Sequence, residues 1–420
     1  MVTARRIDNS EVKKQTKKSR RRSDPAVLSL FSGAGGMDIG LEAAGFKTIG
    51  ILENNETCLK TLRTNRPAWT HVEPRSAVDA ARSISPSHLG LQVGQLDLIA
   101  AGPPCQPFSS AAQWHSSGRR GMSDERSDTV RATVRFVERL LPRVLLIENV
   151  VGFLRDDNGA MKVLDQGLRG INRVHGTSYE LHSFILNAAD YGVAQHRRRA
   201  IVSACRDGEL LSPPPPTHLE KPIRAWDAIG DLPDPGRDLI PLGTWAQDLL
   251  ASIPEGGNYQ WLTSKGGGPE LFGYRTRYWS FLLKLAKDRP SWTLSASAGP
   301  STGPFHWDNR QLTVRERLRL QGFPDDWILE GSLRAQIRMA GNATPPLLAE
   351  IVGREILSQV LGNDDATAQG PSLVCRRKKT IPMAGEPIDI PRHLSHLVGD
   401  KMAHPGAGHG PSPRDNLDIT

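Results

Sequence analysis

Short apolar runs rich in Val, Ile and Leu recur along the first two hundred residues of the chain. They are AVLSLF (26–31), TIGILE (48–53), LDLIAAG (96–102), RVLLIENV (143–150) and RAIVSAC (199–205). Runs without polar alternation are typical of strands that are buried on both faces, and helical segments separate them here. The pattern therefore predicts an α/β fold with a doubly wound parallel sheet.

Helical patterns follow the first run and return late in the chain. The first predicted helix has its inward positions at i, i+3, i+4 and i+7, occupied by Met37, Gly40, Leu41 and Ala44, and Gly45 provides its stop. Regular patterns return at 312–327 and 336–357, where Pro345 and Pro346 suit the first turn of a helix.

The composition divides the chain into five regions. We expect a basic disordered arm at 1–25, a catalytic and cofactor-binding α/β domain at 26–205, a small irregular domain at 206–309, a return segment completing the α/β domain at 310–361, and a flexible tail at 362–420. The irregular region is rich in Pro and Gly and holds six of the nine Trp residues, interleaved with Lys and Arg. These Trp side chains either bind nucleic acid or form the core of a domain that is short of aliphatic residues.

The net charge of +8 is concentrated at one end. Residues 1–22 carry nine Lys or Arg against two acidic residues, a net of +7, which leaves about +1 for the remaining 398 residues. The arm is either a phosphate-binding element or a solvated tail, and any nucleic-acid surface on the folded body must be local.

The sequence predicts no membrane-spanning segment, no disulfide framework and no metal site. No apolar run approaches the roughly 20 residues that cross a bilayer, and the polar N-terminus lacks the core of a signal peptide, so a cytoplasmic location is expected. The four cysteines, at 58, 105, 205 and 375, form no CxxC pair, and no carboxylate or thiol spacing supports a metal site among the histidines of the tail.

A glycine-rich turn at the end of the first predicted strand points to a nucleoside ligand. Gly33, Gly35 and Gly36 let the backbone approach a ligand at a helix N-terminus, but Asp38 replaces the last glycine of a dinucleotide fingerprint. Glu53, at the end of the second predicted strand, can accept hydrogen bonds from ribose hydroxyls. A nucleoside without a pyrophosphate, such as S-adenosylmethionine, fits this pattern, and a purely structural turn is an equal alternative.

Cys105 stands in GPPCQPFS, after the strand run 96–101. Because proline fixes φ and restricts the residue before it, Pro103, Pro104 and Pro107 predict a stiff loop around this thiol. Ligands gather at this edge of open α/β sheets. A rigid exposed cysteine there is a candidate nucleophile, whereas a buried structural cysteine would need no such loop.

Charged groups follow the later strand runs. Glu148, in ENV, ends one strand on the same edge as Cys105 if the strands are parallel, where a carboxylate can bind a base edge or donate a proton. QHRRR (195–199) opens the next run, and alternation places Arg197 and Arg199 on one side and Arg198 on the other. Two guanidinium groups on one side suit a phosphate or a developing anion.

These motifs together resemble the DNA cytosine-5 methyltransferases. The set LFSGAGGMDIGLEAAGF, Glu53, GPPCQPFS, ENV, QHRRR, RQLTVRERLRLQGFPDDW and GNATPP occurs in the family's order over about 26–357. The resemblance implies a Rossmann-like S-adenosylmethionine-dependent domain, and makes 206–309 a target-recognition domain for duplex DNA.

The resemblance also assigns roles to residues. Cys105 would attack carbon 6 of a cytosine flipped out of the duplex, Glu148 would engage ring nitrogen 3, and Arg197 and Arg199 would hold the base and a neighbouring phosphate. The expected cofactor-binding residues are Phe31, Gly33, Gly35, Glu53 and Asn342, and those expected to recognise DNA are Thr293 and Leu294. Around the adenine the choice between Glu73 and Asp79 stays open, and DERSDTV (124–130) departs from the family's DxRGxLF pattern.

The expected protein is a bacterial, cytoplasmic, nucleoid-associated monomer. It is expected to modify DNA either in a restriction-modification system, with a separately encoded endonuclease as a possible partner, or as a solitary regulator. An RNA (tRNA) cytosine-5 methyltransferase on the same scaffold is the main alternative. A non-catalytic DNA-binding protein is the third, and the presence of Cys105, Glu148 and Arg197 argues against it.

Overall fold

The structure is a computed structural model that describes residues 24–104, 128–155, 159–233, 248–297, 299–375, 378 and 380–397. The N-terminal arm expected at 1–25 lies outside these residues except for Asp24 and Pro25, and Cys105 and Pro107 lie outside them as well. Among the described helices, none combines the length and the apolar character that a membrane crossing requires.

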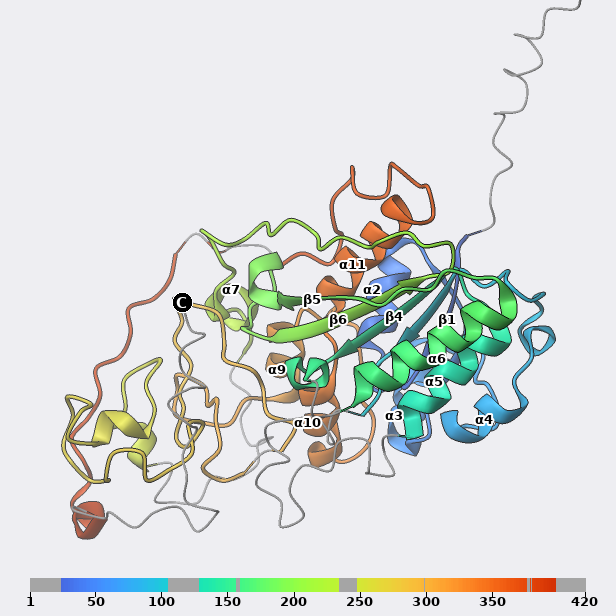
Figure 1. Ribbon diagram of the computed structural model, residues 1–420. Coiled ribbons are helices and arrows are strands. Elements are labelled where there is room, and N and C mark those ends of the chain that lie inside the picture. Colours follow the sequence, from blue (N-terminus) through green and yellow to red (C-terminus); the bar gives the residue numbers. More distant parts are fainter. Residues whose placement is uncertain are drawn as a thin grey trace, which may run out of the picture.

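A six-stranded sheet organises the α/β part (Figure 1). Its order is β2 (Lys47–Leu52), β1 (Ala26–Leu30), β3 (Leu98–Ala101), β4 (Val144–Asn149), β6 (Arg198–Cys205) and β5 (His182–Asn187). The first four strands are parallel, and both β6 and β5 pair in antiparallel fashion. The expected strands are confirmed, but the all-parallel sheet is corrected, and β5 was missed.

The antiparallel direction of β6 is what brings QHRRR to the functional edge. In the register of the two strands Glu148 lies opposite Ile201 and Asn149 lies opposite Ala200. The start of β6 therefore lies beside the end of β4, so Arg199 and Glu148 meet there. A parallel β6 would have placed these arginines at the far edge of the sheet.

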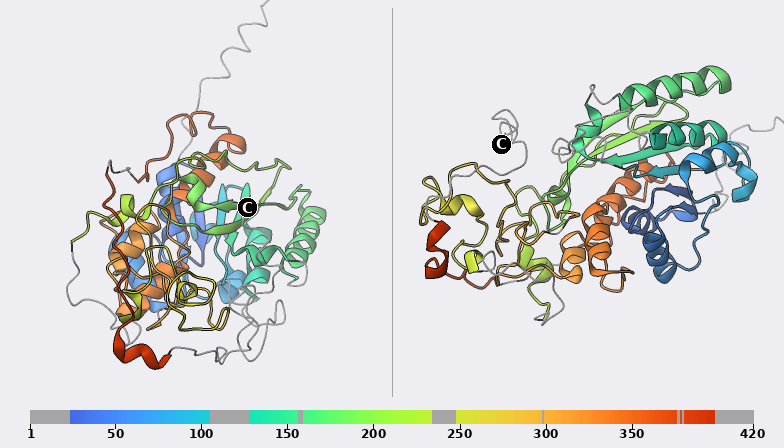
Figure 2. Two further views of the ribbon diagram at one scale, coloured as in Figure 1. Left: turned by 90° about the vertical axis from the view of Figure 1, so that its left-hand side faces the viewer. Right: turned by 90° about the horizontal axis from the view of Figure 1, so that it is seen from below.

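Helices cover both faces of the sheet, as the apolar runs predicted (Figures 1 and 2). One face packs against α4 (Ala77–Ser83), α5 (Asp128–Leu140) and α6 (Ala160–His175). The other packs against α2 (Gly36–Ala44) and α11 (Pro346–Gln359). The strands alternate between these two cores: Leu28 and Leu30 face the first, and Val27 faces the second.

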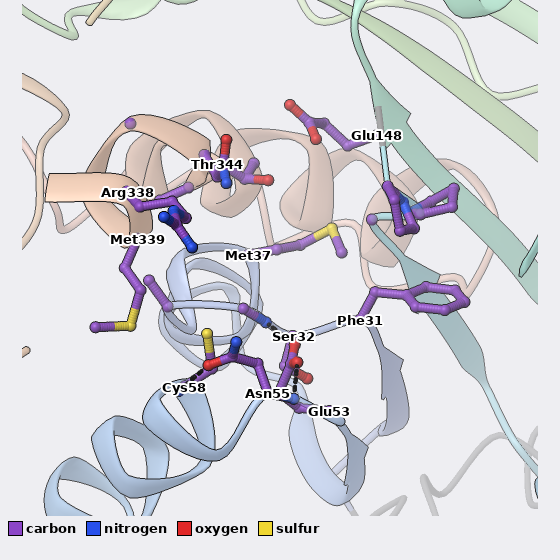
Figure 3. Close-up of a pocket in the computed structure, with 18 of the residues that line it drawn as sticks. Phe31, Ser32, Met37, Glu53, Asn55, Cys58, Glu148, Arg338, Met339 and Thr344 are labelled. Carbon is purple, nitrogen blue, oxygen red and sulfur yellow. Dashed lines mark hydrogen bonds between the residues drawn. The ribbon is translucent and has the colours of Figure 1, made fainter. Parts of the chain in front are cut away.

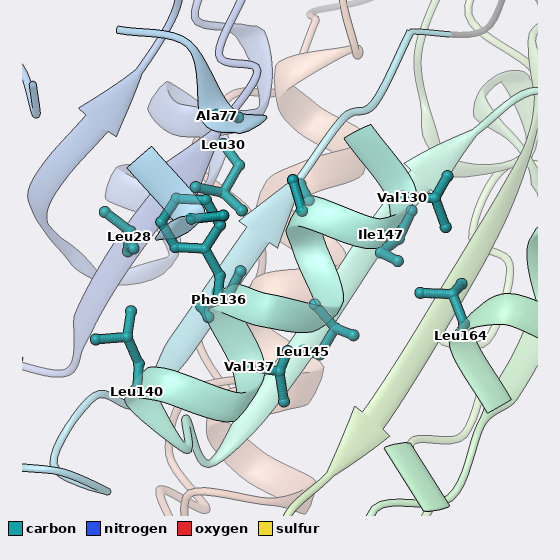
Figure 4. Packing of buried hydrophobic residues seen from close by; sticks show 14 of the residues in the cluster. Leu28, Leu30, Ala77, Val130, Phe136, Val137, Leu140, Leu145, Ile147 and Leu164 are labelled. Atoms are coloured by element: carbon teal, nitrogen blue, oxygen red, sulfur yellow. The ribbon is translucent and has the colours of Figure 1, made fainter. Parts of the chain in front are cut away.

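The pattern of α5 explains its position. Val130, Phe136, Val137 and Leu140 are buried on one face, and Phe136 lies beside Leu28 and Leu30 of β1 (Figure 4). The spacing matches the helical repeat, and the opposite face carries charged residues. Burial of this face fixes the helix on one face of the sheet.

Short elements connect the main ones. They are α3 (Glu56–Asn65), which Asn55 caps through the backbone N–H groups of Thr57 and Cys58, and the 3-10 turns η1 (Pro86–Leu89), η5 (Val151–Leu154) and η7 (Ala188–Tyr191). The side chain of Asn55 thereby fixes the start of α3 directly after Glu53.

The region 206–309 is irregular in its described residues, as its composition predicts. It holds α7 (Ala225–Ile229), η8 (Tyr259–Leu262) and several isolated bridges, and two apolar clusters form its core. Trp307 is 8% exposed and packs 5.6 Å from Trp226 between ring centroids, whereas Trp279 is 49% exposed. The aromatic residues thus divide between core and surface, and Trp245 lies outside the described residues.

The return segment completes the α/β part. It contains α9 (Val314–Leu320), α10 (Leu333–Asn342) and α11, and α11 lies side by side with α2. The close approach requires glycine, because a Cβ atom on Gly40 would lie 2.6 Å from that of Ala349. Thr313 and Glu316 form a capping box at the start of α9.

Beyond residue 361, where a flexible tail was expected, the described residues contact both parts of the molecule. The backbone N–H groups of Ser372 and Leu373 donate to the fully buried Glu350 of α11, at 2.6 and 2.9 Å. Leu394, in η9 (Arg392–Leu397), enters the core of the irregular region. Buried hydrogen-bond acceptors and an apolar anchor hold this segment, a tertiary effect that a polar, Pro-rich composition does not reveal.

Candidate active site

A cavity of about 420 Å³ opens at the carboxyl edge of β1, β2, β3 and β4 (Figure 3). Helix α10 and the segment after it form its opposite wall. The lining includes most of the predicted site residues that the structure describes: Phe31, Gly33, Glu53, Glu148, Arg197, Arg199 and Asn342. Segments more than 300 residues apart in the sequence therefore meet in one space.

Glu53 is held firmly at one end of the cavity. The backbone N–H of Gly33 donates to its Oε2 at 2.8 Å, and that of Asn55 donates to Oε1 at 2.8 Å. Each carboxylate oxygen has two acceptor sites, so capacity remains for hydroxyl groups of a ligand. Gly33 and Phe31 both adopt positive φ, at 56° and 61°, which bends the turn beneath this carboxylate.

Gly35 lies behind this turn rather than on the cavity wall. Its φ of 81° is left-handed, and a Cβ atom there would lie 2.8 Å from Cζ2 of Trp327. The indole N–H of Trp327 donates to the carbonyl of Ala34 at 3.0 Å. Gly35 therefore allows the turn to form and to pack, and the direct cofactor contact expected for it stays a prediction.

One face of α10 contributes the opposite wall. Asn342 ends the helix and lines the cavity together with Ala335, Arg338 and Met339. Figure 3 shows Arg338 and Met339 on this side of the space between Glu53 and Glu148. The sequence analysis missed Arg338, although its spacing of four residues from Asn342 places both on one helical face.

Glu148 and Arg199 form a largely desolvated ion pair at the other end. Nε of Arg199 lies 2.8 Å from Oε1 of Glu148, and the two side chains are 11% and 10% exposed. This oxygen is buried, and its contact among the described residues is the ion pair, so a hydrogen bond to a ligand in the cavity would fall to the second carboxylate oxygen of Glu148. A carboxylate with remaining hydrogen-bond capacity suits recognition of a base edge.

Arg197 performs a different task from Arg199. It is 1% exposed, and its Nη2 donates to the carbonyls of Gly341 and Ala343 at 3.0 and 2.8 Å. These carbonyls belong to the GNAT segment beside Asn342. This Nη2 therefore fixes the segment after α10, and the expectation that both arginines hold the base and a phosphate stays a prediction.

Cys105 lies outside the described residues, but the chain that leads into it is well defined. Pro103 and Pro104 line the cavity, and the backbone N–H of Gly102 donates to the carbonyl of Leu30 at 3.1 Å. The side-chain Nδ2 of Asn149 donates to the carbonyl of Pro103 at 3.1 Å. The end of β4 thus fixes the loop immediately before Cys105, a role for Asn149 that the sequence analysis missed.

The two residues expected to recognise DNA differ in accessibility. Thr293 is exposed, and its hydroxyl donates to the carbonyl of His196 at 2.6 Å, directly beside Arg197. Leu294 is 2% exposed in an apolar cluster. Leu294 therefore anchors the segment by packing, and the DNA contact expected for it stays a prediction.

A family model described as C-5 cytosine-specific DNA methylase matches residues 26–358. The chain belongs to this family. The match spans every motif of the cavity, and it makes this chain a DNA cytosine-5 methyltransferase.

Curated relatives place the methylase among type II enzymes of restriction-modification systems. It is 33% identical to the type II methyltransferase M.SacI of Streptomyces achromogenes over 374 residues, covering 80% of this chain and 93% of the relative. It is 32% identical to the type II methyltransferase M.Eco47II of Escherichia coli over 351 residues, covering 79% of this chain and 78% of the relative. The predicted family membership and enzyme class are confirmed.

Solved structures agree on the fold of the methylase. The Entamoeba histolytica methyltransferase EhMeth superposes with a TM-score of 0.55 at 18% identity, covering 80% of this chain and 99% of that one. At this identity the likeness shows the fold, and the expected Rossmann-like class is confirmed.

The open choice between Glu73 and Asp79 has a structural answer in the methylase. Glu73 pairs with Arg75 at 3.1 Å before α4 begins. Asp79 pairs with Arg82 at 3.2 Å within α4. Neither belongs to the residues that line the cavity, whereas Asn54, Asn55, Thr57 and Cys58 do. The wall after β2 is therefore formed by the β2–α3 connection.

Asp38 is a buried carboxylate behind the glycine turn of the methylase. It is 1% exposed, and neither oxygen accepts a hydrogen bond of good geometry from the described residues. Burial raises the pKa of Asp38 from 3.8 to about 6, while the nearby hydroxyls of Ser29 and Ser32 offset part of that rise. The sequence analysis treated this residue only as the missing glycine of a fingerprint.

Replacement of Asp38 is expected to change the pH dependence of stability. The pKa of Asp38 is higher in the folded state than in the unfolded state, so protonation of this carboxyl group favours the folded state. Its contribution to the unfolding free energy is complete below about pH 4 and is lost as the pH rises through about 6. The unfolding free energy of Asp38→Asn minus that of wild type should therefore rise by roughly 3 kcal/mol from pH 4 to pH 7. Urea denaturation at four pH values measures the difference, and parallel curves for the two proteins would contradict it.

Proposed function

We propose that this methylase transfers the methyl group of S-adenosylmethionine to carbon 5 of a cytosine flipped out of a specific duplex DNA sequence. The carrying observation is one cavity with a ribose-type acceptor, Glu53, at one end and the Glu148–Arg199 pair at the other. The chain entering Cys105 forms part of the same wall through Pro103 and Pro104. A methyl donor and a base can therefore meet within reach of this thiol.

The residues present fit S-adenosylmethionine. The cavity of about 420 Å³ lies within the range of small-molecule sites. Glu53 would accept hydrogen bonds from the ribose hydroxyls, the turn at Phe31 and Gly33 would approach the adenosine, and Asn342 would bind on the amino-acid side. When bound, this cofactor supplies an electrophilic methyl group.

The chemistry then falls to the residues of the chain. The thiolate of Cys105 would add to carbon 6 of cytosine, forming an S–C bond and making carbon 5 nucleophilic. Glu148, in its protonated form, would donate its proton to ring nitrogen 3 and so neutralise the negative charge that develops there as the S–C bond forms. After carbon 5 gains the methyl group it loses its proton to a base, and the S–C bond breaks, which restores the pyrimidine and the free Cys105.

Positioning residues keep these groups in register. Asn149 would hold the Cys105 loop through the carbonyl of Pro103, and Arg197 would hold the GNAT wall through Gly341 and Ala343. Arg199 would orient Glu148 and share its charge. Preorganisation of this kind contributes to rate because little reorganisation is left for the reaction step.

We further propose that the methylase protects host DNA in a restriction-modification system, with a separately encoded endonuclease as its partner. The type II relatives support this role. The protein would act as a monomer in the bacterial cytoplasm, on the nucleoid, because one cleft suffices for one extruded base. The region 206–309 would serve as its target-recognition domain, with Thr293 near the base.

Bisulfite sequencing of DNA from cells that express the methylase tests this function. Cytosines protected in one short repeated context are the expected result, and cells expressing Glu148→Ala should show no such protection. Unmodified DNA together with methylated tRNA would instead establish the RNA activity. The donor is tested separately with purified protein and duplex DNA. If cytosines became methylated without added S-adenosylmethionine, or if no label passed from labelled S-adenosylmethionine to the DNA, the proposed donor would be wrong.

A further inference from the structure

Three aromatic rings form a row beside the catalytic cavity. The ring centroids of His196 and Trp292 lie 6.0 Å apart, and those of Trp292 and Trp279 lie 5.7 Å apart. The first ring belongs to QHRRR, and the other two come from the region 206–309. The row therefore crosses from the α/β part to the region expected to recognise DNA.

The row is joined to the chain that lines the cavity. His196 directly precedes Arg197, which lines the cavity, and Trp292 directly precedes Thr293. The backbone N–H of His196 donates to the carbonyl of Ser291 at 2.8 Å, and the hydroxyl of Thr293 donates back to the carbonyl of His196 at 2.6 Å. These bonds fix the first two rings relative to the Glu148–Arg199 end of the site.

The row is also accessible. Trp279 is 49% exposed, His196 is exposed, and Trp292 is half-buried between them. A Trp ring that served only to pack the junction would be expected to resemble Trp307, which is 8% exposed. Single exposed apolar side chains are common on protein surfaces, but a half-exposed indole that lies beside a second Trp ring offers apolar area that a stacked base could bury.

Basic side chains also surround an exposed ring elsewhere in the irregular region. Tyr274, five residues before Trp279, is 38% exposed, and Nζ of Lys265 lies 4.5 Å from its ring centroid. The guanidinium carbon of Arg275 lies 5.3 Å from the same ring. Exposed rings with neighbouring cations are the combination that binds the bases and the phosphates of an unpaired strand.

We propose that His196, Trp292 and Trp279 form a stacking surface for DNA bases that lose their neighbours when the target cytosine leaves the helix. Trp279 is the outer contact, and it covers a base next to the extruded one. This inference rests on the proposed base-flipping function. It assigns to the irregular region a direct part in holding the opened duplex, in addition to reading its sequence.

Binding to a duplex that contains the site found by bisulfite sequencing tests the proposal. An abasic position replaces the target cytosine, so that the neighbouring bases are already unstacked. We expect Trp279→Ala to raise the dissociation constant for this duplex about 5- to 100-fold, the range of one base–aromatic stack. Trp279→Phe should recover most of the affinity, because a ring remains. Val174→Ala, which truncates an apolar residue that is 73% exposed on α6, serves as the matched control and should not change it.

Two further readouts separate stacking from a structural role. The melting temperature and the affinity for S-adenosylmethionine should be the same in Trp279→Ala and wild type. DNA should quench tryptophan fluorescence in wild type and less in Trp279→Phe, a readout that still decides the matter if the alanine variant does not fold. If the wild type methylates DNA but the Trp279 variants bind DNA and are quenched by it as the wild type is, the stacking surface alone is overturned. A wild type that methylates no DNA would instead overturn the proposed function.

Discussion

Cys105→Ala should abolish methyl transfer to DNA while leaving the affinity for S-adenosylmethionine within a few-fold of wild type. Without the thiolate no bond forms to carbon 6, so carbon 5 stays too weak a nucleophile to accept the methyl group. We expect a loss of at least about 10⁴-fold in turnover, as for other enzymes that lose a covalent nucleophile. Transfer of labelled methyl groups to duplex DNA measures the loss, and equilibrium titration measures cofactor binding.

The other three cysteines are poor candidates for the nucleophile. Burial raises the pKa of Cys58 and of Cys205 to about 12, and that of Cys375 to about 11, so these thiols stay protonated at neutral pH. Cys375→Ala is therefore the matched control and should retain transfer. Duplex DNA with 5-fluorocytosine at the target gives a second readout, because fluorine on carbon 5 cannot leave as a proton. Wild type should form a covalent complex with it, and an equal yield from Cys105→Ala would exclude this nucleophile.

The strands of the sheet could be predicted because each is a continuous apolar run, but their directions could not. A strand buried on both faces reads the same in a parallel and in an antiparallel pair, so nothing in RAIVSAC indicates that β6 runs against β4. Strand β5 was missed for a different reason. Its HSFILN segment lies at the sheet edge, where half-buried and exposed positions alternate and only Leu186 is buried, so it lacks the continuous buried run of the others.

The site residues divide in the same way. Gly33 and Glu53 belong to local turn chemistry, which sequence patterns express well, and they meet through one hydrogen bond. The partners of Arg197 are carbonyls 144 and 146 residues away, and a backbone carbonyl carries no sequence signature. Leu294 shows the limit of a motif, since the pattern gives the position of a residue in the chain and not the side of the chain it faces.

The contact between the start of α2 and the GNAT segment depends on Gly36. A Cβ atom there would overlap the carbonyl oxygen of Thr344 and lie 2.9 Å from Cζ of Phe323. Both neighbours are fixed, because Thr344 belongs to the GNAT segment held by Arg197 and Phe323 packs in an apolar cluster. Gly36→Ala must therefore displace the wall that carries Asn342.

We expect Gly36→Ala to lower the unfolding free energy by about 3 kcal/mol, at the upper end of overpacking effects, and to weaken cofactor binding at least about tenfold. Gly170→Ala is the matched control: it lies inside α6, and nothing stands within 4 Å of the new Cβ atom. Because alanine favours a helix over glycine, this variant should gain up to about 1 kcal/mol. Urea denaturation and cofactor titration of both variants measure these effects. Equal stability of the two would mean that α2 and the GNAT segment can separate at little cost, so that the cavity wall does not depend on their contact.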